Sequence, residues 1–162
     1  MATDIILKIA SIKGESKVQT HEDQIDLLSF SGGASNQGTY ATGGGGGAGR
    51  VDFQDLSVSK YYDLSSVPLM QACATGKDIG ETVFYFRKQA EDEALEYLTI
   101  TLSEAKVTSL STSVSSGGEE RPIESVSFNF KSIKYEYKKQ GDKGGNEGTA
   151  QFEWDVSKAH KV

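Results

Sequence analysis

The sequence is poor in residues that cross-link a chain or bind metal: its 162 residues include one cysteine, Cys73, and two histidines, His21 and His160. A single cysteine excludes an internal disulfide framework. Two histidines and one cysteine leave a zinc site without its usual ligands. We therefore expect neither a metal nor a cofactor. The net charge of −6 argues against a nucleic-acid partner and against adhesion to an anionic membrane surface.

Long apolar runs are also missing. No stretch approaches the roughly 18 consecutive apolar residues that a membrane span needs. The first residues, Met1–Lys8, lack a basic region followed by an apolar stretch and a cleavage site. We expect the chain to be made in the cytoplasm, and any export to use a route that reads no N-terminal signal peptide.

Sequence patterns that would indicate catalysis are absent. No G-x-S-x-G motif occurs, and the paired carboxylates Asp92–Glu93 and Glu119–Glu120 fall in charged or glycine-rich loops. The stretch His21–Asp23 is expected to be a solvated loop, and Cys73 a small buried apolar residue and not a nucleophile. The sequence predicts a protein that is not an enzyme; a hydrolase acting through Cys73 or His21 is the catalytic alternative.

Alternation of apolar and polar residues predicts an all-β protein. The pattern indicates about eight strands, at Ile5–Ile9, Ile25–Ser31, Val51–Val58, Thr82–Lys88, Leu98–Leu102, Val107–Val114, Ser125–Lys139 and Phe152–Val156. One short helix is expected over residues 65–76, with the Ser65–Ser66 hydroxyls as caps, Pro68 in the first turn and Gly76 at its end. We predict one domain, residues 1–162: a closed or nearly closed antiparallel β-barrel of two packed sheets with a flanking helix.

Phase changes within the strands give finer expectations. The alternation slips by one residue near Gln54–Asp55 and again at Lys131–Ser132, which predicts two β-bulges. Within Ile25–Ser31, we expect Leu28 and Phe30 to face the core. Ile25, Leu27, Ser29 and Ser31 then fall on the opposite face, and the two serines are expected to face a hydrophilic surface.

A polar, glycine-dense segment, residues 32–50, separates two of these strands. Gly44, Gly46 and Gly49 fit a G-x-G-x-x-G spacing, but no helix follows, and Gly49–Val51 stands where a phosphate-binding loop needs Gly-Lys-Ser/Thr. Nucleotide binding is therefore not expected. Two classes remain: a structural subunit that contacts copies of itself, or a monomeric β-barrel ligand-binding module.

Several segments, in order along nearly the whole chain, resemble one known family. They are the turn Lys13–Ser16, the strand Ile25–Ser31, the run Gly43–Gly49, Asp55–Ser57 followed by Lys60–Tyr61, the helix Leu69–Gly76, and the strands Tyr97–Leu102 and Val126–Phe130. Together they are similar to the hemolysin-coregulated protein (Hcp) family, which forms the tube of bacterial type VI secretion systems. The family often has a Trp-Gly pair after its second strand, where this chain has Ser31-Gly32-Gly33.

The resemblance implies a secreted structural protein. Members form hexameric rings that stack into an inner tube, inside a contractile sheath on a baseplate, under a spike protein. The tube is exported, and some members carry or chaperone small effector proteins in the lumen. By this resemblance, Ser29 and Ser31 would face the lumen. The loop residues would lie against the adjacent ring: Gly38, Thr39, Tyr40, Gly43, Gly44, Gly45, Gly46, Gly47, Gly49 and Arg50.

Overall fold

The computed structural model describes residues 3–36, 51–89, 94–118, 120–140, 146–158 and 160–161. In these residues it contains twelve strands and one helix, so the prediction of a mainly β protein with one short helix is confirmed. The elements are β1 (Thr3–Ile9), β2 (Ile25–Leu27), β3 (Ser29–Ser31), β4 (Ala34–Asn36), β5 (Val51–Phe53), β6 (Leu56–Tyr61), α1 (Ser66–Thr75), β7 (Asp78–Gln89), β8 (Ala94–Ser113), β9 (Ile123–Asn129), β10 (Ser132–Gln140), β11 (Asn146–Asp155) and β12 (His160–Lys161).

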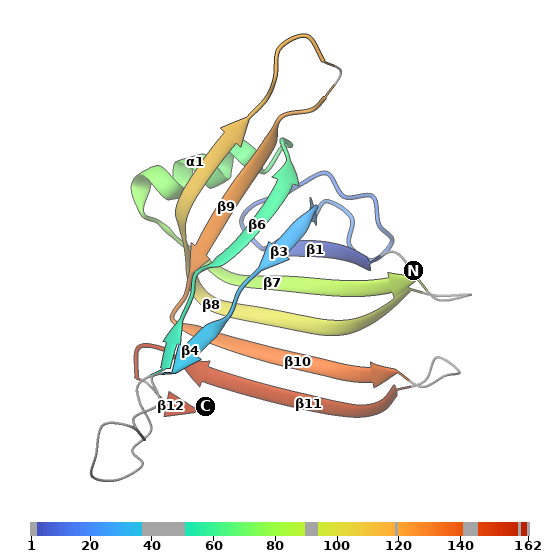
Figure 1. Ribbon diagram of the computed structural model, residues 1–162, viewed down its shortest axis with the longest axis vertical. Coiled ribbons are helices and arrows are strands. Elements are labelled where there is room, and N and C mark those ends of the chain that lie inside the picture. The colour runs from blue at the N-terminus through green and yellow to red at the C-terminus, as the bar shows by residue number, and fades with distance from the viewer. Residues whose placement is uncertain are drawn as a thin grey trace.

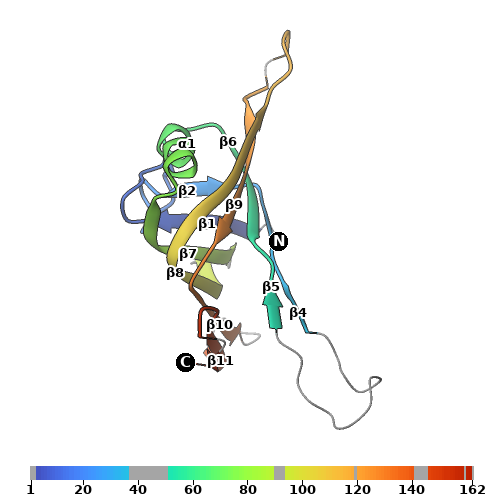
Figure 2. The ribbon, with the colours of Figure 1, turned by 90° about the vertical axis from the view of Figure 1, so that its left-hand side faces the viewer.

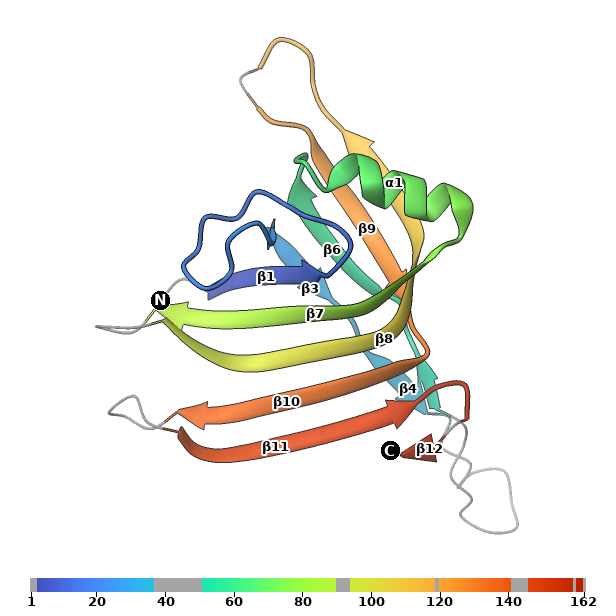
Figure 3. The same ribbon diagram turned by 180° about the vertical axis from the view of Figure 1, so that it is seen from behind.

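The long strand β8 connects the two halves of the molecule (Figure 1). Its first half pairs with β7 and β10, and its second half pairs with β9. Between the halves, Glu104 has a positive φ of 47° and the register with β7 shifts on either side of Gly80. Irregular pairing of this kind bends a strand. The bend lets one strand belong to two differently oriented parts of a ten-stranded sheet (Figure 3). Strands β4 and β5 form a separate two-stranded sheet.

The predicted strand over residues 25–31 is two strands. β2 pairs with β1, whereas β3 pairs with β6, and the change falls at Leu28, whose N–H donates to the Ser59 carbonyl at 2.7 Å. The expectation that Leu28 faces the core is wrong, because the residue is 47% exposed while Ile25 and Leu27 are buried. The described residues contain no sheet closed into a barrel, so the predicted closure is not confirmed.

Both predicted bulges are breaks between strands. The slip at Gln54–Asp55 separates β5, which pairs with β4, from β6, which pairs with β3 and β9. The slip at Lys131–Ser132 separates β9 from β10, and both strands pair with β8. A one-residue slip in the apolar alternation marks either event, since both turn the following side chains to the other face.

The core lies between two β layers, which Figure 2 shows edge-on. Phe30, from the layer of β3, β6 and β9, meets Phe84 and Phe86 of β7 edge-to-face, with ring centroids 5.2 and 5.1 Å apart. Phe84 also contacts Phe128 of β9 at 5.9 Å. These aromatic contacts cross the core and hold the two layers together in a fixed relative position.

Helix α1 packs on this core through Leu69 and Ala72 and ends as predicted at Gly76, which is left-handed (φ 66°). The expected serine cap is absent, because the Ser65 hydroxyl donates to the Asp63 carboxylate and not to the helix. Among the described residues no helix is both long enough and apolar enough to span a membrane.

Candidate functional site

Two rows of serine cross the sheet formed by β3, β6, β9 and the second half of β8. The first row is Ser31, Ser57, Ser127 and Ser109, and the second is Ser29, Ser59, Ser125 and Ser111. We call these eight residues the serine face. Pairing in register on four neighbouring strands places all eight side chains on the same side of the sheet.

The strand pleat explains the arrangement. Between the two serine rows, the register aligns Phe30, Val58, Val126 and Leu110, which point to the opposite side and into the core. All eight serines are exposed or half-buried. Hydroxyls of neighbouring strands share hydrogen bonds, Ser29 with Ser59 at 2.5 Å and Ser57 with Ser127 at 3.0 Å. The strand Ser29–Ser31 thus contributes one end of a wider polar surface.

The chemistry of this surface is uniform: its eight residues carry hydroxyl groups and no charge. Serine is depleted at stable protein–protein interfaces and is rare among residues that dominate binding energy. The serine face therefore suits contact with water or with a loosely held molecule better than a tight interface. Sequence reasoning found only Ser29 and Ser31. The signal for the other six was serine at every second position of three later strands.

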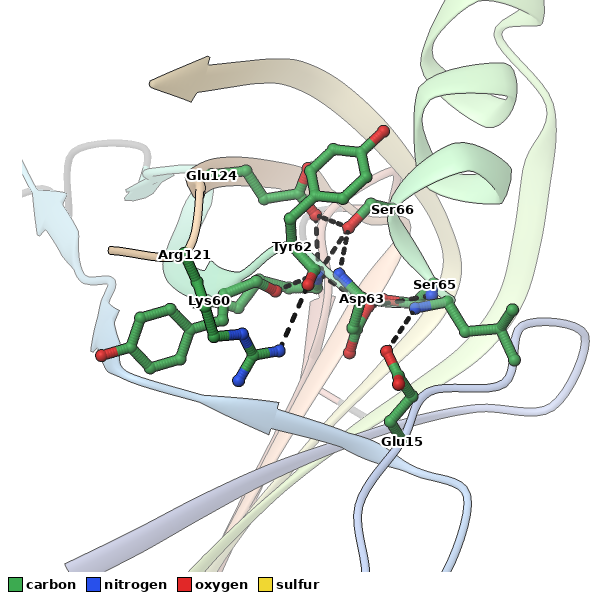
Figure 4. A network of polar contacts seen from close by, with 10 residues as sticks. Glu15, Lys60, Tyr62, Asp63, Ser65, Ser66, Arg121 and Glu124 are labelled. Carbon is green, nitrogen blue, oxygen red and sulfur yellow. Dashed lines mark hydrogen bonds and ion pairs between the residues drawn. The ribbon is translucent and has the colours of Figure 1, made fainter. Parts of the chain in front are cut away.

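A buried polar network lies where β6 leads into α1 (Figure 4). The Lys60 ammonium donates to the Glu124 carboxylate at 2.6 Å, to Asp63 at 2.9 Å and to the Ser66 hydroxyl at 2.9 Å. The Lys60 and Glu124 side chains are completely buried. Sequence analysis did not single out either residue. Their signal is that a lysine and a glutamate occupy positions that the alternation of β6 and β9 places in the core.

The same network fixes the start of the helix. The Ser66 hydroxyl donates to Glu124 at 2.7 Å and accepts the Asp63 N–H at 3.0 Å. Asp63 accepts the Ser65 N–H at 2.8 Å. On the exposed side of the network, the Glu15 carboxylate accepts a hydrogen bond from the Leu64 N–H at 2.8 Å. Side chains from β6, β9 and the loop after β1 thus anchor one helix terminus, and hydrogen bonds to ionised groups are the stronger kind.

The loop before β2 is not solvated throughout, contrary to the expectation for His21. The ring of His21 is buried against Tyr85, with centroids 4.6 Å apart. One ring nitrogen contacts the Gln24 amide oxygen at 2.8 Å, and the other contacts the Glu96 carboxylate. The described residues contain no cluster of three or more potential metal-ligating side chains. His21 therefore connects the loop to the β7–β8 hairpin.

The predicted ring-stacking residues, from Gly38 to Arg50, lie outside the residues that the structure describes, but the base of their loop is defined. β4 and β5 pair from Ala34 opposite Phe53 to Asn36 opposite Val51. Just beyond, the Asp55 carboxylate accepts hydrogen bonds from Thr108 at 2.7 Å and from Asn129 at 2.8 Å. The segment 37–50 thus begins and ends on paired strands.

Comparisons with known proteins agree on one family. Residues 6–137 match the family model described as type VI secretion system effector, Hcp. Protein hcp1 of Pseudomonas aeruginosa is 43% identical over 157 residues, which cover 96% of each chain. The chain therefore belongs to the Hcp family of type VI secretion proteins.

Solved structures show the same fold. A type six secretion system protein superposes with a TM-score of 0.92 at 28% identity, covering 99% of this chain and all of that one. Hcp1 from Salmonella typhimurium superposes with a TM-score of 0.81 at 32% identity, with both chains covered completely. The β layers, helix and loops described above are thus an Hcp fold over the full length.

Proposed function

We propose that this chain is a structural subunit of the type VI secretion inner tube, which assembles into hexameric rings that stack. Family membership supports this function, and the serine face is the structural observation that carries it. The lumen of an export tube needs a wall that other proteins pass without sticking. A hydrated, uncharged hydroxyl surface on a regular sheet meets that need.

In this proposal Ser29 and Ser31 face the lumen, together with the other six serines of the serine face. Small effector proteins are the molecules that this wall contacts, and the subunit holds them before export without performing catalysis. The serine side chains supply hydrogen bonds of low individual strength, so cargo is retained weakly and can leave. The other partners are the spike protein, the contractile sheath and the baseplate. The subunit is made in the bacterial cytoplasm and secreted through the type VI apparatus.

The fold is proposed to be a nearly closed barrel in which β2 and β3 together complete the circuit. β2 pairs with β1 and β3 pairs with β6, and the Leu28–Ser59 hydrogen bond spans the junction. β6 leads through β9, β8 and β7 back to β1. A wall of this kind leaves few unpaired backbone groups facing a lumen.

The loop residues Gly38–Arg50 are proposed to lie against the adjacent ring. The segment starts and ends on the β4–β5 pair, and this pair lies away from the body of the larger sheet (Figure 2), which supports this role. Glycine lets two backbones approach closely, which suits a contact between rings.

Sedimentation of the purified protein tests assembly. A species six times the 17.5 kDa mass of the chain is expected at micromolar concentration. A single species at the mass of one chain would contradict the proposal and favour a monomeric ligand-binding barrel.

Accessibility tests the orientation of the serine face. A single cysteine is placed at Ser111 in a Cys73→Ala background, and the rates of labelling by a small maleimide and by a polymer-linked maleimide are compared. In assembled protein the polymer reagent should be slowed at least tenfold more than at a control cysteine replacing Lys158. Equal slowing at both positions would place the serine face outside the lumen.

A further inference from the structure

Helix α1 presents an uncharged apolar surface to solvent. Val67 and Met70 of α1 are 64% and 48% exposed, and Leu64, which lies two residues before the helix begins, is 64% exposed. No charged residue occurs from Ser66 to Thr75, although a quarter of the whole chain is charged. We call Leu64, Val67 and Met70 the helix patch. Val67 and Met70 are three residues apart on the helix and therefore lie on the same face, and exposed apolar side chains grouped without charge commonly mark a contact with another molecule.

A second apolar surface lies on the β10–β11 hairpin. Tyr137 and Phe152 are 46% and 39% exposed, on the same face as the buried Ile133. Phe152 stacks on Trp154 with centroids 6.1 Å apart and contacts Tyr135 at 6.5 Å. We call these four aromatic residues the hairpin patch. It continues the core face of β7 and β8 onto β10 and β11, the next two strands of the same sheet (Figure 1).

The two patches differ in chemistry and lie far apart. α1 lies beside β9 and the second half of β8, toward one end of the molecule, whereas the β10–β11 hairpin lies toward the other end (Figures 1 and 3). The helix patch is aliphatic with a methionine, and the hairpin patch is aromatic, a pairing in which the thioether sulfur packs well against rings. One chain therefore carries two unlike surfaces that match each other, as a head-to-tail contact between copies requires.

The charge distribution favours the same pairing. Residues 131–162, which contain the hairpin, have seven lysines against five acidic residues, a net charge of +2. Residues 1–130, which contain the helix, have ten basic and eighteen acidic residues, a net charge of −8. Glu15 stands at the edge of the helix patch through its hydrogen bond to Leu64. A basic hairpin segment of one copy thus approaches an acidic body of the next, which favours encounter in this orientation.

We propose that the helix patch of one subunit binds the hairpin patch of the next subunit within a ring. The inference rests on the proposed self-assembly and assigns the two surfaces that make its lateral contact. Because each subunit carries both patches, a contact between two unlike patches can be repeated from subunit to subunit until a ring closes. If a patch bound only its own copy on a second subunit, assembly would end at a dimer.

The test uses two double variants of the full chain. Val67→Glu with Met70→Glu charges the helix patch, and Tyr137→Glu with Phe152→Glu charges the hairpin patch. Each variant alone is expected to sediment as a monomer at concentrations where the wild type is a ring. An equimolar mixture is expected to form a dimer and nothing larger, because one intact patch from each partner pairs and the two remaining patches are blocked. Ser115→Glu with Ser116→Glu, in the loop after β8, is the charge-matched control and should still form rings.

The outcomes separate the inference from the proposed function. If the wild type does not assemble, the tube function itself fails. If the wild type and both variants all form rings, the patches are not the contact, although the tube function stands. If one variant dimerises alone and the mixture adds no new species, the contact is self-paired and the inference is wrong. Should a glutamate variant lose its circular-dichroism signal, Val67→Ser and Phe152→Ser are used, with at least a tenfold weaker association expected and an unchanged association contradicting the proposal.

Discussion

Lys60 and Glu124 form an ion pair that is completely buried, with the lysine ammonium 2.6 Å from the carboxylate oxygen. The residues stand directly opposite each other on β6 and β9, and both contact Ser66 at the start of α1. The second oxygen of Glu124 is buried and has no hydrogen-bond partner among the residues that the structure describes. The pair therefore connects the sheet that carries the serine face to the helix that carries the helix patch.

Removing one member of this pair should be costly. Lys60→Met leaves the Glu124 carboxylate buried without its counter-ion, so the free energy of unfolding should fall by about 3–5 kcal/mol. Replacing both residues, Lys60→Met with Glu124→Leu, should recover most of that loss, because no unpaired charge stays in the core. Denaturant titrations of the three proteins measure both effects. A double variant as unstable as the single one would show that the network positions the helix through contacts other than this ion pair.

A glycine in the first loop is required by space. A Cβ at Gly14 would lie 2.4 Å from the Gln24 carbonyl oxygen, a backbone atom that cannot move aside alone. Gly14→Ala should therefore lower the free energy of unfolding by about 1–3 kcal/mol. The matched control is Gly33→Ala, where the nearest atom is a side-chain oxygen at 3.7 Å and little loss is expected. Equal thermal midpoints for the two variants would contradict the close approach at Gly14.

Alkaline pH should weaken the fold partly through Tyr85. Burial, with the nearby Glu96 and Glu81 charges, raises the pKa of Tyr85 above its ordinary value of 10.0. The unfolded chain therefore loses this proton at a lower pH than the folded one. The contribution of Tyr85 is complete below pH 10 and is lost as the pH rises through the folded-state pKa. The free energy of unfolding of Tyr85→Phe should fall less steeply from about pH 9 to 11 than that of the wild type. Identical pH profiles would contradict this assignment.

The glycine loop should affect stacking and not folding. Shortening Gly38–Gly49 removes no residue of the described core, so the thermal midpoint should change little and rings should still close. Stacking of rings into longer tubes, counted in electron micrographs, should decrease. Tubes as long as those of the intact protein would rule out a role of the loop between rings.

Much of the fold could be predicted because period-two alternation is a local signal. It located the strands around Ile5–Ile9 and Leu98–Leu102, and the glycine that ends α1 at Gly76 was also readable. Alternation alone does not say which strand pairs with which. It therefore missed the division of residues 25–31 into β2 and β3, and it placed Leu28 in the core.

The missed site residues depend on long-range pairing. The alternation of β6 and β9 places Lys60 and Glu124 on the core side of their strands, but only the β6–β9 register shows that they lie directly opposite each other as a pair. His21 likewise meets Glu96 only because the loop before β2 packs on the β7–β8 hairpin. Sequence analysis named only Ser29 and Ser31 of the serine face. The other six serines join them only through the register of four neighbouring strands.

Electron micrographs of the purified full-length protein test the central claim most directly. The account predicts closed rings with six-fold symmetry and a central opening, together with short stacks of such rings at higher concentration. Only isolated particles of the size of one chain, across concentrations up to those at which tubes would form, would contradict it.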